Sequence, residues 1–282
     1  MEPVSCASGE WTHPASGHTL TYRLWRPAAP RMLLVLVHGF AEHGGRYAAF
    51  AESLAARGIC VAVPDLWAHG RSGGERGDLG DPAHTVRDLQ ALTAAVFLPQ
   101  TGFSRYSVYG HSFGGLIAVL WGMANDAALG RLVVQSPLFE VAFELPWWKT
   151  VPAWVLAACW PKLRFEIDLD AGALSHNPAV AEAYRNDPLV HHAMSAGTYR
   201  ALLQRRDEAM AGASRILAPI LLLLAQEDRV VSVDAARRWF EQVAAEKRLV
   251  EFPGCYHELH HEQVREDILR LAADWVLADA ER

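Results

Sequence analysis

The sequence predicts an α/β fold in which a mostly parallel, doubly wound sheet is interrupted by one helical insertion. Short apolar runs alternate with helical patterns over the first half of the chain, and the alternation resumes in the last quarter. Nearly continuous apolar runs are typical of parallel strands that are buried on both faces. Their alternation with helices indicates right-handed βαβ units, which together build a doubly wound sheet.

The strands and helices are assigned from these patterns in chain order. Residues 19–25 alternate between polar and apolar side chains, which predicts a strand with one solvated face. Further strands are expected at residues 32–37, 60–63, 106–109, 132–134, 220–224 and 248–252. Helical patterns lie at residues 47–57, 86–97, 113–124, 180–185, 233–245 and about 262–278.

The alternation stops at Pro137. Residues 138–213 contain no convincing strand, although they include the tryptophan-rich stretch PWWKTVPAWVLAACWPKL. The simplest explanation is a helical cap inserted into a single α/β domain. We therefore predict a core formed by residues 1–137 and 214–282, and a cap formed by residues 138–213.

The composition favours a globular protein and argues against nucleic acid as a partner. The net charge is −6, and no block of basic residues offers a phosphate-binding face. The N-terminus lacks a basic stretch followed by an apolar one, and the longest apolar run, residues 151–161, is too short to span a bilayer. Cys6, Cys60, Cys159 and Cys255 lack C-x-x-C spacing, which indicates free thiols in a reducing compartment. We therefore expect a cytoplasmic protein.

The strongest motif is Gly110-His111-Ser112-Phe113-Gly114, which lies between a predicted buried strand and a helix. G-x-S-x-G in this context is the nucleophile elbow of α/β-hydrolases, where a tight turn exposes the serine at the start of the helix. The alternative is a glycine-rich turn that only lets the strand and helix pack closely. The strand and helix on either side favour Ser112 as a catalytic nucleophile.

A catalytic serine of this fold needs an acid and a base that follow it in the order Ser…Asp/Glu…His. Asp228 follows the strand at residues 220–224 and precedes a helix, so we assign it as the acid, with Glu227 as its competitor. His257 is the first histidine after the last strand and is assigned as the base. The loop after residues 32–37 carries His38-Gly39-Phe40, and we expect the backbone amides of Phe40 and Phe113 to form the oxyanion hole.

A zinc site is the alternative for the same histidines, because HELHH at residues 257–261 fits the H-E-x-x-H motif of metallopeptidases. That motif requires His257 and His261 on one face of a regular helix, and a third ligand elsewhere. Pro253 and Gly254 lie just upstream, and zinc would leave the G-x-S-x-G motif unexplained. A binding protein on a hydrolase scaffold is a third alternative, but such proteins normally lack a triad member. We expect a catalyst that needs no metal or organic cofactor.

Several longer stretches resemble the monoglyceride lipase and lysophospholipase family of serine α/β-hydrolases. They are HGFAEHGGRY, DLWAHGRSGGERG, GHSFGG, QSPL, LSHNPAVAEAYRNDPL, LLLLAQEDRVV and FPGCYHELHHE, and they run over nearly the whole chain from about Trp11. The resemblance implies the α/β-hydrolase fold, with an eight-stranded sheet and a helical cap inserted after strand 6. Ala68 stands where relatives often have glycine, in a loop that we consider structural.

The resemblance also implies a substrate pocket. Glu42, Arg46, Tyr184 and His260 match the family residues near the glycerol end of the substrate, although Glu42 and Arg46 could instead form an ordinary i,i+4 ion pair. The cap is rich in apolar residues. We expect part of them to line an acyl tunnel, namely Phe139, Phe143 and Trp148, and Trp147, Trp148 or Trp154 to contact lipid.

Together, the motifs and the resemblance predict a serine esterase that hydrolyses monoacylglycerols to fatty acid and glycerol through an acyl-enzyme. Lysophospholipids and a broader range of esters remain alternatives, because the elbow and the triad do not determine the head group. The expected partner is a single-chain acyl ester. Transient contact of the cap with a membrane or micelle is also expected, which would make the protein peripheral to the membrane.

Overall fold

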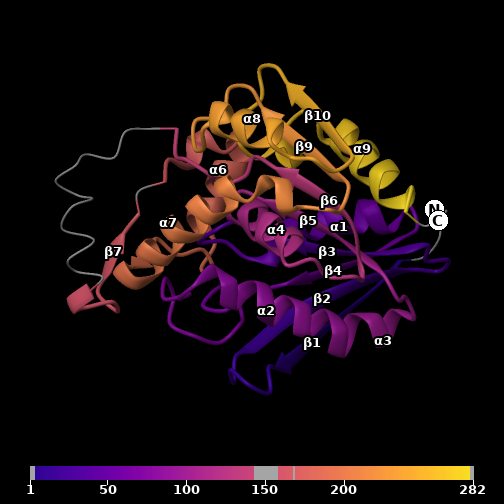
Figure 1. Ribbon diagram of the computed structural model, residues 1–282, viewed down its shortest axis with the longest axis horizontal. Coiled ribbons are helices and arrows are strands. Elements are labelled where there is room, and N and C mark those ends of the chain that lie inside the picture. Colours follow the sequence, from indigo (N-terminus) through magenta and orange to yellow (C-terminus); the bar gives the residue numbers. More distant parts are fainter. Residues whose placement is uncertain (1–3, 143–157, 168, 280–282) are drawn as a thin grey trace.

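The computed structural model describes residues 4–142, 158–167 and 169–279. An eight-stranded sheet with the order β1-β2-β4-β3-β5-β6-β9-β10 forms its centre (Figure 1). The strands are β1 (Val4–Thr12), β2 (Thr19–Pro27), β3 (Met32–Val37), β4 (Ile59–Pro64), β5 (Tyr106–His111), β6 (Leu129–Gln135), β9 (Ile220–Ala225) and β10 (Lys247–Phe252). β1 and β2 pair antiparallel with their neighbours, and all the other pairs are parallel. The predicted mostly parallel, eight-stranded α/β-hydrolase sheet is confirmed.

Two apolar layers enclose the sheet, as expected for strands buried on both faces. The helices of the core are α1 (Ala48–Ala55), α2 (Pro82–Leu92), α3 (Leu98–Thr101), α4 (Phe113–Met123), α8 (Val233–Glu241) and α9 (Arg265–Leu277). α1 and α9 contribute to one layer, and α2, α4 and α8 contribute to the other. Every residue of β3, β4, β5, β6 and β9 is buried, which explains their apolar sequences.

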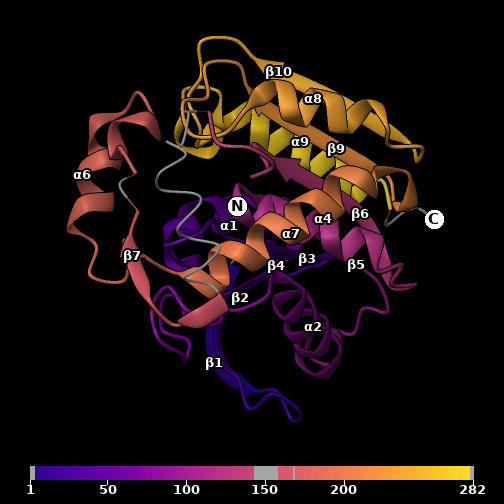
Figure 2. The same ribbon diagram turned by 60° about the vertical axis from the view of Figure 1, so that its left-hand side comes forward.

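The chain leaves the sheet after β6 and returns at β9, so the insertion follows the sixth strand as predicted. The described part of the cap contains α6 (Pro178–Asn186), α7 (Ala196–Ala211) and a separate antiparallel pair, β7 (Arg164–Glu166) with β8 (Ala193–Ser195). Figure 2 shows α6 and β7 in a lobe beside the sheet, whereas α7 crosses the core near α4. The expectation that the cap contains no strand was wrong, because three-residue strands are too short to show a period of two.

Two further elements, β1 and α7, were not predicted individually, and other predicted elements differ from the structure at their ends. β1 was not predicted; most of its residues are exposed, so it lacks an apolar face that a pattern could reveal. α2 begins at Pro82, before the apolar pattern starts, because Asp81 caps it by accepting a hydrogen bond from the Ala83 amide at 2.9 Å. Among the described residues, no helix is long and apolar enough to cross a membrane.

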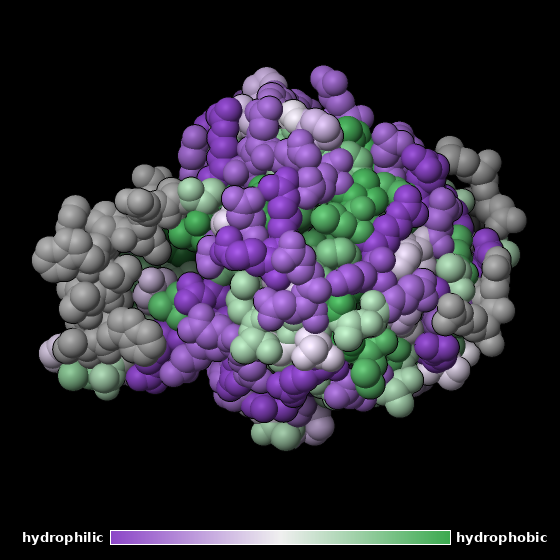
Figure 3. Space-filling view, turned by 45° about the horizontal axis from the view of Figure 1, so that its top comes forward, coloured by the Kyte–Doolittle hydropathy of each residue, from purple (hydrophilic) through white to green (hydrophobic). Residues whose placement is uncertain are grey.

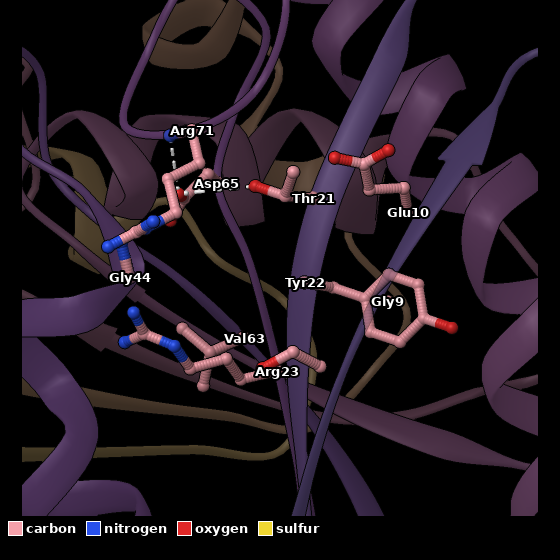
Figure 4. Close-up of a pocket in the computed structure, with 10 residues that line it drawn as sticks. Gly9, Glu10, Thr21, Tyr22, Arg23, Gly44, Val63, Asp65 and Arg71 are labelled. Carbon is pink, nitrogen blue, oxygen red and sulfur yellow. Dashed lines mark hydrogen bonds between the residues drawn. The ribbon is translucent and has the colours of Figure 1, made fainter.

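The predicted catalytic residues follow different strands but meet at one edge of the sheet. Phe40 follows β3, Ser112 follows β5, Asp228 follows β9 and His257 follows β10. Because these strands are parallel, their carboxyl ends share an edge, where open α/β sheets place their sites. A cavity of about 480 Å³ lies elsewhere, beside the β1–β2 hairpin, and none of the predicted site residues lines it (Figure 4).

Candidate active site

The turn between β5 and α4 holds Ser112 in a backbone conformation that non-glycine residues rarely adopt. Its φ is 56° and its ψ is −116°. The Ser112 amide donates a hydrogen bond to the Gln135 carbonyl at 3.0 Å, and the Ser112 carbonyl accepts from Leu138 at 3.0 Å. Strain of this kind persists only where the surroundings enforce it, and it concentrates at functional sites. Ser112 is therefore fixed by β6 and by the first residues of the cap.

The two glycines of the motif are required by close backbone contacts. A Cβ atom on Gly110 would lie 2.0 Å from the Gly114 carbonyl oxygen. A Cβ atom on Gly114 would lie 2.1 Å from the carbonyl oxygen of Val37, at the end of β3. Only glycine fits at either position. The glycines thus bring the elbow against the loop that follows β3.

Asp228 and His257 form a buried pair. The imidazole Nδ1–H of His257 donates a hydrogen bond to Asp228 Oδ2 at 2.7 Å, and both side chains are at most 3% exposed. The other carboxylate oxygen, Oδ1, accepts from the amides of Val230 and Val231 at 2.8 and 2.9 Å. The competitor Glu227 is exposed and directs its side chain to no such partner among the described residues. Asp228 therefore has the geometry of an acid that orients a histidine.

The electrostatics of this pair suit a general base. Burial would lower the pKa of His257, but the negative charge of Asp228 and the hydrogen bond to it outweigh burial and raise that pKa. Burial would raise the pKa of Asp228, yet the interaction with His257 and the two backbone amides lower it. Asp228 is thus held as a carboxylate that stabilises a protonated His257.

His257 lies beside the elbow. Its ring centroid is 4.6 Å from that of His111, the residue that precedes Ser112. Within the described ranges no hydrogen bond joins Ser112 to His257, and such bonds often shorten only when substrate binds. Burial lowers the pKa of His111 to about 3, so this neighbour is neutral near pH 7 and does not repel a proton on His257.

The loop after β3 brings the two expected oxyanion residues together. The rings of Phe40 and Phe113 meet edge to face, with centroids 5.7 Å apart. The Gly39 amide donates a hydrogen bond to Glu42 Oε1 at 2.6 Å, which fixes the start of the loop. His38 is satisfied locally, since its Nδ1–H donates to the Gly39 carbonyl at 2.7 Å and its Nε2 accepts from the Leu66 amide at 3.0 Å. The side chain of His38 is thus structural.

Segment 187–191 of the cap contacts this loop at three points. His43 Nε2–H donates a hydrogen bond to Asp187 Oδ2 at 2.9 Å. The His191 amide donates to the carbonyl of Ala41 at 2.9 Å, and Ala41 itself has a positive φ of 67°. The His191 ring packs edge to face against Phe40, with centroids 5.6 Å apart. The cap therefore helps to hold the loop that carries Phe40.

The residues matched to the head-group pocket are brought together, but two of them are already paired. Glu42 accepts hydrogen bonds from the Gly39 amide, from Tyr47 Oη at 2.7 Å and from Arg46. Arg46 also binds Glu258 in a bidentate pair at 2.7 and 2.9 Å. Although burial would raise the pKa of Glu42, Arg46 and other neighbours lower it to about 2. The result is a buried cluster of two carboxylates around one guanidinium.

Tyr184 and His260 keep free polar atoms beside that cluster. Arg46 packs over the Tyr184 ring at 4.9 Å, while the Tyr184 hydroxyl and His260 Nε2 are buried and have no hydrogen-bond partner in the described structure. The Gln135 amide nitrogen donates to the Nδ1 atoms of His111 and His260 at 3.1 and 3.2 Å. Gln135 thereby makes each Nδ1 an acceptor and leaves an N–H on Nε2. His260 thus offers a donor and Tyr184 a hydroxyl.

Of the residues expected to line an acyl tunnel, Phe139 lies within the described part of the chain. Phe139 is fully buried and packs against Trp239 of α8, with ring centroids 4.9 Å apart, so its contacts are those of a core residue. Phe143, Trp147, Trp148 and Trp154 lie outside the described residues.

A zinc site does not fit the HELHH segment. His257 lies outside any helix, and only Leu259–His261 forms a 3-10 turn, so His257 and His261 do not share the face of a helix. Glu258, His260 and His261 do place ligand atoms within 4.8 Å of one another. Both oxygens of Glu258, however, already accept from Arg46, whose fixed charge would repel a second cation.

Sequence reasoning missed two members of the site, Glu258 and Gln135. Glu258 was considered only as part of a zinc motif, and Gln135 only as part of a family stretch. Arg46 and Glu258 are separated by 212 residues, and no local pattern signals such a pair.

A strained serine between a strand and a helix, with a buried Asp–His pair at the same edge of the sheet, defines a serine hydrolase of the α/β-hydrolase fold. Residues 28–264 match the family described as "Serine aminopeptidase, S33". The chain therefore belongs to this family, and the resemblance to monoglyceride lipases is confirmed.

Individual relatives agree with this assignment. A monoacylglycerol lipase of Mycolicibacterium smegmatis is 33% identical over 265 residues, which cover 93% of this chain and 94% of the relative. A protein named as a phospholipase in Bacillus subtilis is 27% identical, over 88% of this chain and 96% of the relative. The crystal structure of the monoacylglycerol lipase of Paleococcus ferrophilus has a TM-score of 0.81 and 27% identity, over 98% of this chain and 99% of that one.

The elbow geometry predicts that Gly114→Ala destabilises the protein. The added methyl group would overlap the Val37 carbonyl, so β3 or α4 must shift, at a cost of about 1–3 kcal/mol in the free energy of unfolding. Urea denaturation followed by circular dichroism measures the loss. Gly172→Ala is the control, because the atom nearest to its Cβ would be Asp170 Oδ1, at 3.1 Å, and no backbone atom is among the three nearest. Equal stability of the two variants would contradict the tight contact.

Proposed function

We propose that the protein hydrolyses monoacylglycerols to free fatty acid and glycerol through an acyl-enzyme on Ser112. The observation that carries the proposal is the buried Asp228–His257 pair beside the elbow serine. His257 Nδ1 is occupied by Asp228, so Nε2 is the nitrogen that accepts a proton. A lipid ester as substrate is supported by the relatives named as monoacylglycerol lipases.

In the proposed reaction, His257 Nε2 takes the Ser112 hydroxyl proton as the serine oxygen attacks the ester carbonyl carbon. The amides of Phe40 and Phe113 donate hydrogen bonds to the oxyanion, which is the kind of contact whose removal typically costs about 3–4 kcal/mol. The imidazolium then gives its proton to the leaving glycerol oxygen. Water, deprotonated by His257, releases the fatty acid by the reverse sequence.

Glycerol as the leaving group is supported by Tyr184 and His260. Glu42 and Arg46 already bind each other, and Arg46 also binds Glu258, while Glu42 accepts from Gly39 and Tyr47. The hydroxyl of Tyr184 and Nε2–H of His260 are two buried polar atoms beside the cluster that have no hydrogen-bond partner among the described residues. A diol provides both donors and acceptors for them. A substrate without hydroxyl groups would leave these buried atoms unpaired, so the site disfavours it. A lysophospholipid, the main alternative, would place a charged phosphate there.

Contact with a lipid surface is proposed for residues 160–165 of the cap, which end in β7. Trp160, Leu163 and Phe165 are 64, 48 and 39% exposed, although each is a large apolar or aromatic side chain. The basic residues Lys162 and Arg164 alternate with them. Apolar and basic side chains on one short segment suit the interface of an anionic membrane. Elsewhere hydrophilic side chains cover much of the surface, as Figure 3 shows for one face.

Ser112→Ala should abolish ester hydrolysis, with kcat/KM for a monoacylglycerol reduced by a factor on the order of 10⁴ or more. The hydroxyl is the nucleophile, and the rest of the site cannot replace it. Hydrolysis is followed by fatty acid release, and Ser214→Ala, at an exposed serine, serves as the control. Substantial activity in Ser112→Ala would refute the proposed function.

Tyr184→Phe should lower kcat/KM for monoacylglycerol about five- to tenfold, as expected for one lost hydrogen bond, and leave a simple alkyl ester of the same acyl chain unaffected. The melting temperature should not fall, because the hydroxyl has no hydrogen-bond partner among the described residues. Tyr199→Phe, at another tyrosine of the cap, is the matched control. An equal loss on both substrates would remove the head-group contact.

Replacing Trp160, Leu163 and Phe165 together by serine should reduce co-sedimentation with vesicles that contain anionic phospholipid. Hydrolysis of a short, water-soluble ester should be unchanged. Leu217→Ser provides the control, because Leu217 is 74% exposed but directly precedes β9, far in the chain from residues 160–165. Absence of vesicle binding by the wild type, or equal binding by the triple variant, would exclude this surface.

A further inference from the structure

Glu258 is a buried acid that the proposed reaction does not use. It follows His257 directly in the chain, and its side chain is only 2% exposed. Its two oxygens accept from the two terminal nitrogens of Arg46 at 2.7 and 2.9 Å. Its backbone amide donates to the carbonyl of Leu174 in the cap at 2.8 Å, so the whole residue is fixed. A buried charge of this kind is costly unless it is paired, and its presence calls for a reason.

The charges of the cluster do not cancel. Arg46 carries one positive charge, since a guanidinium does not lose its proton in proteins. Glu42 is ionised, as its lowered pKa of about 2 implies, and Glu258 binds Arg46 in the bidentate manner of a carboxylate. Two carboxylates and one guanidinium leave a net charge of −1. Because the cluster is buried, water screens this charge poorly.

The other groups around His257 do not offset this negative charge. Besides the cluster's own Glu42, Arg46 and Glu258, they are Asp228 after β9, His111 at the end of β5, and His260 and His261 on the loop after β10, where His261 Nε2 lies 3.8 Å from Glu258 Oε2. Burial lowers the pKa values of His111, His260 and His261, which are therefore neutral near pH 7. The imidazole of His257 thus faces Asp228 and a cluster with one surplus negative charge.

We propose that Glu258 is a positioning residue that holds the buried Glu42–Arg46–Glu258 cluster at a net charge of −1 and thereby stabilises the protonated form of His257. His257 becomes protonated when it accepts the Ser112 proton, so the same charge favours the transition state. The proposal rests on the proposed function, in which His257 is the base. Without Arg46, the two acids would repel each other; without Glu258, the cluster would be neutral.

The sign of the effect follows from the chemistry of the base. His257 must be unprotonated to accept a proton, so activity is lost as the pH falls through its pKa. Glu258→Gln removes one negative charge and lowers that pKa. The acid limb of the pH profile should then move to lower pH by about one pH unit. A variant that merely damaged the fold would lose rate at every pH and leave the limb in place.

The test is the rate constant of Ser112 labelling by a fluorophosphonate, measured between pH 4 and 9. This reagent carries no glycerol, so it reports the base rather than head-group contacts. Glu258→Gln should shift the acid limb to lower pH, while Glu258→Asp, which keeps the charge, should retain the wild-type limb. Glu262→Gln is the matched control, because Glu262 is also buried in this loop but binds His176 of the cap.

An acid limb in Glu258→Gln equal to that of the wild type overturns the proposal. If Glu258→Gln does not fold, Glu42→Gln decides, since it removes one negative charge from the same cluster and must shift the limb in the same direction. A wild-type protein that reacts with the fluorophosphonate but not at Ser112 would instead overturn the proposed function, and the two failures are thereby distinguished.

Discussion

The contact between the elbow and the end of β3 is the constraint on which the rest of the site depends. It is possible only because Gly110 and Gly114 carry no side chain, and it forces Ser112 into its strained conformation. The Ser112 backbone then binds the ends of β6 and the first residues of the cap. One tight turn therefore aligns the loop after β3, the serine and the start of the insertion through backbone contacts alone.

Around this turn, most of the buried titratable groups act on one another rather than on solvent. Gln135 holds two histidines in the same tautomer, and burial keeps both neutral. The charged groups are gathered into the Asp228–His257 pair and the cluster around Arg46. This separation matters because charges interact strongly in a low-dielectric site. A negative charge there stabilises a protonated His257, and a positive charge would destabilise it just as strongly. Neutral histidines next to His257 are as much a part of the design as the acid that orients it.

The sequence predicted the parts of this structure that have a local signature. The buried strands β3, β5 and β9 show as apolar runs, and the elbow shows as G-x-S-x-G. Asp228 shows as an acidic residue between a strand and a helix, and His257 as the first histidine after the last strand. β7 and β8 escaped because three residues cannot display a period. Glu258 escaped because its meaning comes from Arg46, which lies far away in the chain. A motif residue can be recognised from its neighbours in the sequence. The net charge of a buried cluster, in contrast, depends on residues that are neighbours only in the folded structure.

The cap reaches the site through two separate stretches. Segment 187–191 binds the loop after β3, while Leu174 and His176 bind the loop after β10 through the Glu258 amide and the Glu262 carboxylate. The cap is thus hydrogen-bonded to the loops on both sides of the site. Protein engineers who exchange caps among such enzymes should keep these stretches as part of the recipient protein. A grafted cap that lacked these stretches would lose the hydrogen bonds that hold the loops after β3 and β10 in place.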